Sequence, residues 1–459
     1  MLPRGGAPVT PADRIVDSHE LSPTQEGMLF HGLLGETSGV DLEQIVCTIR
    51  GPFDRAALRT AFRKVANRHP ILRTRFAYDD AGRPVQEVLE SVEIPYELID
   101  LSSAEPPYRP RRLEETLALD RARGVDLERA PAMRLTLVDE GADEHHVIWT
   151  FHHALLDGRS FPLVLREVFS FYYAAVQGRE LELPVPRPYR EYVEFVSALD
   201  LTAAEVYWRR RLSGFSAPTP LGIDRATPGT EPLGAVQGVS ERRLPLETTA
   251  TLRRFAAAQS VTLNTLLQAA WAVLLHRYSE ERDVVFGATR AGRRSAFPDG
   301  DEMIGLFINT LPLRVDVDPE RHVAELLKEL RALQLELREF EHTPLVKVQS
   351  WSDVPRGSPL FETIVVYEER SLDETLRTLD PDGDRLAFAY HGQTNYPLTV
   401  VAYGDERMLV RLENDRRRVD DAAASRMLEH LVTILAALPE HSDRMLHELP
   451  LGGGGGVGV

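Results

Sequence analysis

The chain has 459 residues, a formal net charge of -17 at pH 7 and 43% hydrophobic residues. This length predicts two or three domains with substantial cores, and the acidic charge argues against a nucleic-acid partner, because no basic stripe offsets it. The single cysteine, Cys47, excludes a disulfide framework and fits a reducing compartment. No apolar run has the ~18 residues that a membrane span needs, and the N-terminus lacks the apolar core of a signal peptide, so we expect a cytoplasmic protein without a membrane partner.

The first part of the chain is expected to be a flexible arm over residues 1–20, which are polar and rich in Pro and Gly. A helix follows, with Ser22 as its N-cap, Pro23 at its first position and Gln25 reaching back to the cap. These residue types at this spacing indicate a well-defined helix start.

Three more elements are predicted before residue 80. Residues 42–50 alternate as in a strand, and residues 55–67 have the apolar spacing of a helix. Pro70 ends this helix, and residues 71–76 are predicted to form a strand.

Two histidines stand where a strand meets a helix. Residues 133–138 and 147–151 are rich in β-branched and aromatic residues and are predicted to be strands joined by a polar turn. Residues 160–175 have helical apolar spacing. The string FHHALLDG, residues 151–158, therefore leaves a strand and enters a helix, which allows its imidazoles to reach a cleft.

The residue types of this string allow acid–base chemistry. A neutral imidazole of His152 or His153 can take a proton at pH 7. Gly158 lets the chain double back, so that Asp157 lies behind a ring or against a structural cation. The local pattern leaves other roles open, because Asp-Gly before a helix is a common turn or N-cap pair and adjacent histidines are often buried and hydrogen bonded.

A metal site is disfavoured by the same sequence. It would need the neighbouring pair His145 and His146 to converge with the motif histidines, and Cys47 is isolated on another strand. We therefore expect no metal.

The second half of the chain follows a Pro- and Gly-rich linker over residues 216–238. A long apolar helix over residues 263–278 is expected to be capped by Thr262. The other predicted elements are strands over residues 239–244, 284–289, 361–367, 386–391, 397–403 and 408–413, and helices over residues 247–259, 320–340 and 421–438. Residues 452–459 form a Gly-rich tail.

Several strings carry a resemblance to a known family. HHALLDG resembles the HHxxxDG signature that condensation domains of nonribosomal peptide synthetases share with other chloramphenicol-acetyltransferase-like acyltransferases. Four more strings are similar to condensation motifs: LSPTQEGMLFH (21–31), RHPILRTRF (68–76), YREYVEF (189–195) and IGLFINTLPLR (304–314). The strings that begin at His342 and Ser358 match more loosely, because an aromatic residue is missing after the histidine. The resemblance covers residues 21–451.

The resemblance implies an α/β fold, an α+β sandwich of two chloramphenicol-acetyltransferase-like lobes in a V-shaped pseudo-dimer with a central tunnel. The N-terminal lobe would span residues 21–215 and carry HHxxxDG. The C-terminal lobe would span residues 239–451, and part of its later strand region would cross over to complete the first lobe's sheet.

The resemblance also implies roles for individual residues. His153 would be the general base or would position the acceptor, while His152 and Gly158 would shape the loop. Asp157 would form a structural ion pair with Arg293, for which the adjacent Arg294 is an alternative. Supporting positions around the tunnel would be His69, Arg73, Asn309 and Asn395.

The implied function is condensation in natural-product biosynthesis. An acyl or aminoacyl group would pass from a carrier-protein phosphopantetheine thioester to an amine or hydroxyl acceptor, which is a small molecule or is carrier-bound, to give an amide or an ester. No cofactor would be bound by the chain itself, and no Ser or Cys stands in a nucleophile elbow. Because the chain starts at a Met and stops where a synthetase would continue into an adenylation domain, we expect a free-standing enzyme, although a domain excised from a synthetase would look the same.

Three alternatives stay open. The chain can be a non-catalytic module that recruits carrier or tailoring proteins, although such relatives usually lose the second histidine or the aspartate. It can be a CoA-dependent acyltransferase, which would act on soluble acyl-CoA. It can be an epimerisation domain, although the second carboxylate string of that class is not found.

Overall fold

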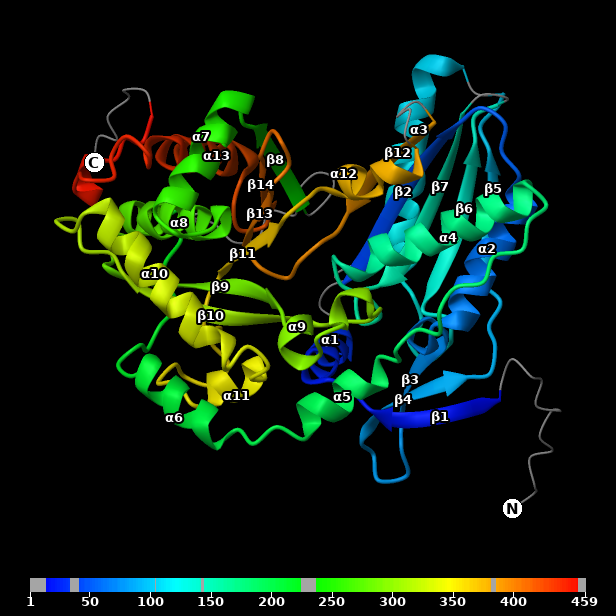
Figure 1. Ribbon diagram of the computed structural model, residues 1–459, viewed down its shortest axis with the longest axis horizontal. Helices are drawn as coiled ribbons and strands as arrows, with labels where there is room; N and C mark the ends of the chain where they lie inside the picture. Colours follow the sequence, from blue (N-terminus) through cyan, green and yellow to red (C-terminus); the bar gives the residue numbers. More distant parts are fainter. Residues whose placement is uncertain are drawn as a thin grey trace. The chain divides into compact units, whose positions relative to one another are not determined.

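A computed structural model describes residues 14–33, 41–103, 105–141, 144–223, 237–380 and 385–452. The chain forms two compact units, and each is built from three segments (Figure 1). Unit 1 comprises Met1–Leu199, Gly292–Ile308 and Leu372–Thr394. Unit 2 comprises Asp200–Ala291, Asn309–Ser371 and Asn395–Val459.

Unit 1 is discontinuous in the sequence. The first segment of unit 1 ends at Leu199, and two later segments return to unit 1. Residues 224–236 of the expected linker and residues 453–459 of the expected tail lie outside the described residues.

A five-stranded sheet forms the centre of unit 1, in the order β12-β2-β7-β6-β5. Its strands are β2 (Leu42–Arg50), β5 (Tyr96–Asp100), β6 (Met133–Asp139), β7 (Glu144–His152) and β12 (Leu386–His391). The predicted strand at 386–391 is thus confirmed, and it pairs antiparallel with β2 at the edge of the sheet. β7 lies between β2 and β6 and pairs antiparallel with both.

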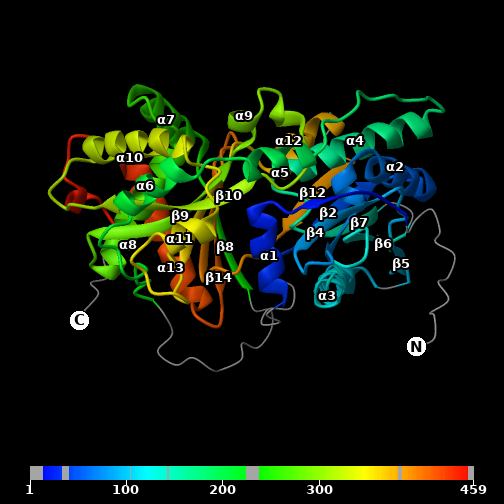
Figure 2. The ribbon, with the colours of Figure 1, turned by 90° about the horizontal axis from the view of Figure 1, so that it is seen from below.

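Helices cover both faces of this sheet. α2 (Arg55–Arg68) and α4 (Ser160–Val176) lie on one face and α3 (Arg109–Ala122) on the other, as Figure 2 shows. Because successive strand residues point to opposite faces, Val147 and Trp149 join the larger core, whereas Ile148 packs toward α3. Both faces are therefore apolar, and β7 is buried along most of its length.

A smaller sheet completes the N-terminal part of unit 1. It has the order β1-β4-β3, with β1 at Ile15–Glu20, β3 at Thr74–Tyr78 and β4 at Pro84–Leu89. The expectation of an arm over residues 1–20 is wrong for β1, because its backbone pairs with β4. Residues 1–13 lie outside the described residues.

The helix start predicted at Ser22 is confirmed. α1 spans Pro23–Leu33, the backbone N–H of Gln25 donates to Ser22 Oγ, and Gln25 Oε1 accepts from the backbone N–H of Ser22. The strand predicted over residues 71–76 is only partly right. Pro70–Arg73 forms a 3-10 turn that buries Ile71 and Leu72, and β3 begins at Thr74.

Unit 2 holds a six-stranded mixed sheet in the order β10-β9-β11-β13-β14-β8. Its strands are β8 (Gln237–Arg243), β9 (Asp283–Ala291), β10 (Ile308–Asp316), β11 (Thr363–Glu368), β13 (Leu398–Tyr403) and β14 (Leu409–Asp415). β11 runs parallel to β9 and β13, and β14 runs antiparallel to β13 and β8.

The core of unit 2 is organised by α8 (Leu263–Ser279), which contacts α7 (Leu246–Ala258), α10 (Val323–Arg338) and α13 (Asp421–Ala437) (Figure 1). Its N-cap is Thr262, as predicted, whose hydroxyl accepts from the backbone N–H of Thr265. The remaining short helices are α5 (Arg190–Ser197), α9 (Arg293–Ala296) and α12 (Leu372–Leu376) in unit 1 and α6 (Thr202–Arg211) and α11 (Leu345–Ser350) in unit 2. Among the described residues, no helix is long and apolar enough to span a membrane.

Candidate active site

The histidine motif leaves the end of β7 and enters α4 within unit 1. β7 ends at His152, and α4 begins at Ser160. In the pairing with β2, His152 lies opposite Leu42 and Phe151 opposite Glu43. A strand at the middle of a sheet thus fixes where the motif loop starts.

Asp157 is a buried anchor of this loop. Its Oδ1 accepts from Arg293 Nη2 at 2.6 Å and from the backbone N–H of Ser160 at 3.0 Å, and its Oδ2 accepts from the backbone N–H of Phe307 at 2.9 Å. The side chains of Asp157 and Arg293 are both 0% exposed. Because both carboxylate oxygens accept protein hydrogen bonds and the side chain is fully buried, Asp157 holds the loop in shape and is out of reach of a substrate.

The arginine that pairs with Asp157 is Arg293, the first of the two candidates. Its neighbour Arg294 is exposed and pairs with Asp301 at 2.6 Å. The Arg293 guanidinium also lies over the ring of Phe307, with 4.4 Å from Cζ to the ring centroid. Segment 292–308 therefore closes over the motif loop from within the same unit.

Gly305 explains part of the fifth motif. The Ser160 hydroxyl donates to the Gly305 carbonyl oxygen at 2.6 Å, and the Gly305 N–H donates to Ser160 Oγ at 3.0 Å. A Cβ at position 305 would lie 2.1 Å from the ring of Tyr189, so only glycine allows this approach. The Tyr189 hydroxyl donates to the Leu306 carbonyl oxygen at 2.6 Å. The segments that contain Ser160, Tyr189 and Gly305 are far apart in the sequence and therefore contact one another beside the histidine loop.

His152 is held neutral. It is buried, and its Nδ1 accepts from the backbone N–H of Ala154 at 3.1 Å. Burial, and secondarily the neighbouring His153, lowers the pKa of His152 to about 3. A ring that stays neutral and accepts a backbone hydrogen bond shapes the loop, which is the role that the resemblance implies for it.

His153 differs from His152 because its ring accepts no hydrogen bond from the described residues. Its backbone N–H donates to the Asp41 carbonyl oxygen at 2.7 Å, which fixes the start of the loop. Its side chain is 19% exposed, and its Nδ1 has no hydrogen-bond partner among the described residues. Its Nε2 lies 3.8 Å from Oε1 of Glu43. This imidazole can therefore exchange a proton without first breaking a strong protein hydrogen bond.

Glu43 is the site residue that the sequence analysis misses. It lies on β2, and its side chain is only 3% exposed. Burial raises the pKa of its carboxyl group, and His153, Tyr390 and Arg121 act against that rise. The available signal was an acidic residue inside the apolar strand LEQIVCTIR, because carboxylates are rarely buried without a specific role.

Two of the predicted supporting residues serve structural contacts in unit 1. His69 Nε2 lies 2.8 Å from Glu167 Oε2 on α4, so this buried histidine ties the end of α2 to the helix that follows the motif. Arg73 donates to the Leu89 carbonyl oxygen at the end of β4, and burial lowers the pKa of its guanidinium.

The other two supporting residues belong to unit 2. Asn309 Nδ2 donates to the carbonyl oxygens of Glu341 at 3.0 Å and Thr343 at 2.7 Å, which fixes the turn after α10. Asn395 precedes β13. Gly158 of unit 1 lies in the turn between Asp157 and α4.

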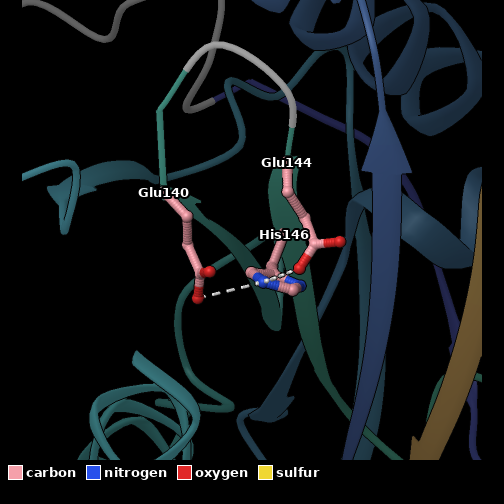
Figure 3. A group of neighbouring side chains, drawn as sticks. All are labelled: Glu140, Glu144 and His146. Atoms are coloured by element: carbon pink, nitrogen blue, oxygen red, sulfur yellow. Dashed lines mark ion pairs between the residues drawn. The ribbon is translucent and has the colours of Figure 1, made fainter. Parts of the chain in front are cut away.

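A second group of ionisable residues lies at the opposite end of β7. Glu140, Glu144 and His146 bring ligand atoms within 4.8 Å of one another, and Figure 3 shows both carboxylates turned toward the His146 ring. Among the described residues, this is the group of His and acidic side chains whose ligand atoms lie close enough together to hold a metal ion. The protein also satisfies these groups itself, because His146 Nε2 lies 3.2 Å from Glu140 Oε1 and its Nδ1 lies 3.0 Å from Thr48 Oγ1.

The pair His145 and His146 therefore does not converge with the motif histidines. His146 and His152 are six positions apart along β7. At the usual strand rise this is about 20 Å.

Comparison with known proteins identifies the family. The sequence-family model described as the condensation domain matches residues 16–452. A linear gramicidin synthase of Brevibacillus parabrevis is 38% identical over 437 residues, which cover 95% of this chain and 6% of that protein. Chondramide synthase of Chondromyces crocatus is 40% identical over 415 residues, which cover 90% of this chain and 10% of that protein. The chain thus spans a tenth or less of the length of these two relatives.

Solved structures agree on the fold. The first condensation domain of the calcium-dependent antibiotic synthetase, in complex with a substrate analogue, has a TM-score of 0.77 and 21% identity, with 95% of this chain and 99% of that chain covered. The X-domain from teicoplanin biosynthesis has a TM-score of 0.77 and 23% identity, with 94% and 97% covered. The mixed α/β architecture is the chloramphenicol-acetyltransferase-like fold of these domains. The chain belongs to the condensation-domain family.

Proposed function

We propose that this chain is a condensation enzyme that transfers an acyl or aminoacyl group from a carrier-protein phosphopantetheine thioester to an amine or hydroxyl acceptor. The observation that carries the proposal is His153, an imidazole with an unpartnered Nδ1 on a loop that a buried ion pair holds in place. The family and the relatives, which are named as synthases of linear gramicidin and of chondramide, support condensation as the reaction class.

In the proposed mechanism, the acceptor attacks the thioester carbonyl carbon while His153 takes the proton that the acceptor nitrogen or oxygen loses. The tetrahedral intermediate then collapses, the C–S bond breaks, and the departing thiolate takes the proton from His153. General acid–base catalysis of this kind contributes about 10²-fold to 10⁴-fold in rate.

No covalent acyl-enzyme enters this mechanism. Two hydroxyls flank the motif in the sequence, those of Thr150 and Ser160, and both are buried. Thr150 Oγ1 donates to Asp120 Oδ2, and Ser160 Oγ is hydrogen bonded to Arg293 and Gly305. A hydroxyl in these contacts is a structural group and lacks an adjacent general base. The phosphopantetheine arm would arrive with the carrier protein and leave with it.

Recruitment of another protein is the second candidate function. A structure with this fold, the X-domain from teicoplanin biosynthesis, is described in complex with OxyB, so the fold alone does not decide between catalysis and recruitment. The unpartnered ring nitrogen of His153 favours catalysis, since a pure docking module gains nothing from it.

The test uses holo carrier proteins loaded with a panel of α- and β-aminoacyl groups and offered both amines and alcohols. Loss of the acyl group and product mass are followed for the wild type, for His153→Ala and for the matched control His146→Ala at the other end of β7. We expect product from the wild type and the control, and a loss of about 10²-fold to 10⁴-fold with His153→Ala. Equal turnover by all three proteins would remove His153 from the mechanism.

Two other outcomes point to the alternatives. Carrier binding without turnover across the panel would favour recruitment. Turnover of soluble acyl-CoA in preference to loaded carrier protein would favour the CoA-dependent reaction.

A further inference from the structure

Glu43 is a buried carboxylate that the protein leaves partly unsatisfied. A hydrogen bond from the Tyr390 hydroxyl lowers the pKa of Glu43 against the effect of burial, but Oε2 has no partner at full hydrogen-bond geometry among the described residues, whereas both oxygens of Asp157 are occupied. Its Oε1 faces His153 Nε2 at 3.8 Å. A buried carboxylate with so few donors is costly, so its retention beside His153 points to a ligand with a donor at Oε1, the oxygen that faces the ring.

Gly392 and Arg121 shape the surroundings of Glu43. A Cβ at position 392 would lie 2.2 Å from the Tyr390 hydroxyl and 2.5 Å from Glu43 Oε2, so Gly392 leaves room at this oxygen. Arg121 donates to the carbonyl oxygens of Leu42 and His391, both at 2.7 Å, and so holds β2 and β12 together beside the carboxylate.

We propose that Glu43 is the subsite for the acceptor's ammonium group and that it selects amines over alcohols as acceptors. This inference rests on the proposed function, which leaves amide and ester formation open. With 3.8 Å between Oε1 and His153 Nε2, one nitrogen atom can lie about 2.8 Å from Oε1 and about 3 Å from Nε2 at the same time. The two side chains thus form a pair of acceptors for one cationic donor.

The chemistry of an amine acceptor makes such a pair useful. An α-amino group has a pKa of about 8, so at pH 7 most acceptor molecules arrive as ammonium ions and cannot attack. The ammonium group gives one proton to the Glu43 carboxylate, from which it passes to solvent, and the neutral nitrogen keeps its place. His153 takes the second proton as the C–N bond forms, and the departing thiolate receives that proton when the C–S bond breaks. An alcohol brings no cation, so it gains nothing from the charge of Glu43.

The decisive variant is Glu43→Gln, which keeps the size and the hydrogen-bonding ability of the side chain and removes its charge. With an amine acceptor and a loaded carrier protein, we expect KM for the amine to rise about 10-fold to 100-fold. KM for the loaded carrier protein should not change. Any turnover with the matching alcohol should be unchanged or higher.

A positioning role would give a different result. If Glu43 only orients His153, Glu43→Gln should lower kcat equally for amine and alcohol acceptors with KM for the amine unchanged, and that outcome overturns the proposal. The matched control is Glu140→Gln, which removes the carboxylate beside His146 and should leave both acceptor profiles as in the wild type. Glu43→Asp, which keeps the charge, should recover part of the amine preference and covers the case in which the amide variant folds poorly.

Binding separates this inference from the proposed function. Calorimetry with an amino acid amide and with its hydroxy analogue, without any carrier protein, should show binding of the amide to the wild type and its loss in Glu43→Gln. Equal binding of the two compounds overturns the ammonium subsite. Selective amide binding without turnover of any loaded carrier protein would sustain the subsite and overturn condensation as the function.

Discussion

The two ends of β7 carry the same kinds of residues and differ in what the protein does with them. At one end, His146 lies between Thr48 and Glu140, and His145 Nδ1 lies 3.0 Å from Asp139 Oδ1. At the other end, His153 and Glu43 face each other at 3.8 Å, and each has an atom without a hydrogen-bond partner among the described residues.

Under the proposed function, this difference separates the reactive end of β7 from the structural end. Histidines and carboxylates close together are not enough, because ion pairs of this kind also stabilise a hairpin. The distinguishing feature is a histidine and a carboxylate with unpaired polar atoms, next to a loop that buried hydrogen bonds hold in place. The anchoring contacts lie around Asp157, and they hold His153 in place without including it.

The largest effect on stability should come from removing the anchor of the reactive end. Arg293→Met would leave the Asp157 carboxylate buried without its cation, and we expect the free energy of unfolding to fall by about 3–5 kcal/mol. Urea unfolding measures this. The control Arg294→Met changes an exposed guanidinium and should alter the unfolding free energy by less than about 1 kcal/mol. Similar losses in both variants would contradict the anchoring role.

Low pH should reduce the free energy of unfolding through His152. The folded-state pKa of this ring is about 3, while an unfolded histidine titrates near 6.5, so between these values the unfolded chain binds the additional proton. This contribution to stability is complete above pH 6.5, falls as the pH drops, and stops changing below about pH 3. At pH 5 the loss is about 2 kcal/mol.

The variant His152→Asn isolates this contribution. Its side-chain oxygen is able to accept the Ala154 N–H and does not titrate. We expect a smaller fall in the unfolding free energy between pH 7 and pH 5 for His152→Asn than for the wild type. Identical pH dependence in the two proteins would show that His152 is not the titrating group.

The smallest effect should come from the satisfied end of the strand. Glu140→Gln weakens the contact with His146 Nε2 and leaves Thr48 Oγ1 near the other ring nitrogen, so we expect a loss of about 0.5–1.5 kcal/mol in unfolding free energy. Condensation activity should be unchanged. A fall in activity as large as that of His153→Ala would mean that the two ends of β7 are functionally coupled.

The sequence was sufficient for many of the elements and for the position of the motif loop, but not for β1, β4, β5 or α3. Apolar alternation and cap residues located β2, β7, α8 and the edge strand β12, because their signals are local. The resemblance supplied the partner of Asp157, which no local pattern contains, since 136 positions separate Asp157 from Arg293.

Glu43 was not predictable in the same way. Its neighbourhood with His153 depends on the register of β2 against β7, and a shift by one residue would turn its side chain to the other face. The 3-10 turn at Pro70–Arg73 was missed for a related reason, because burial of Ile71 and Leu72 overrides the strand propensity of that stretch. Pairing register and tertiary burial are properties of the folded unit.

The anchoring of the loop also dictates when the site can form during synthesis. The motif emerges from the ribosome well before Arg293 and Phe307, which supply the cation and the backbone donor for Asp157. Until then, the loop contains a carboxylate without its cation, and the β2–β7–β6 part of the sheet lacks the edge strand β12. A nascent chain of about 200 residues would therefore have the histidine motif and most of the strands of unit 1 but not a formed site, so residues 292–308 and 386–391 are the late segments that complete it.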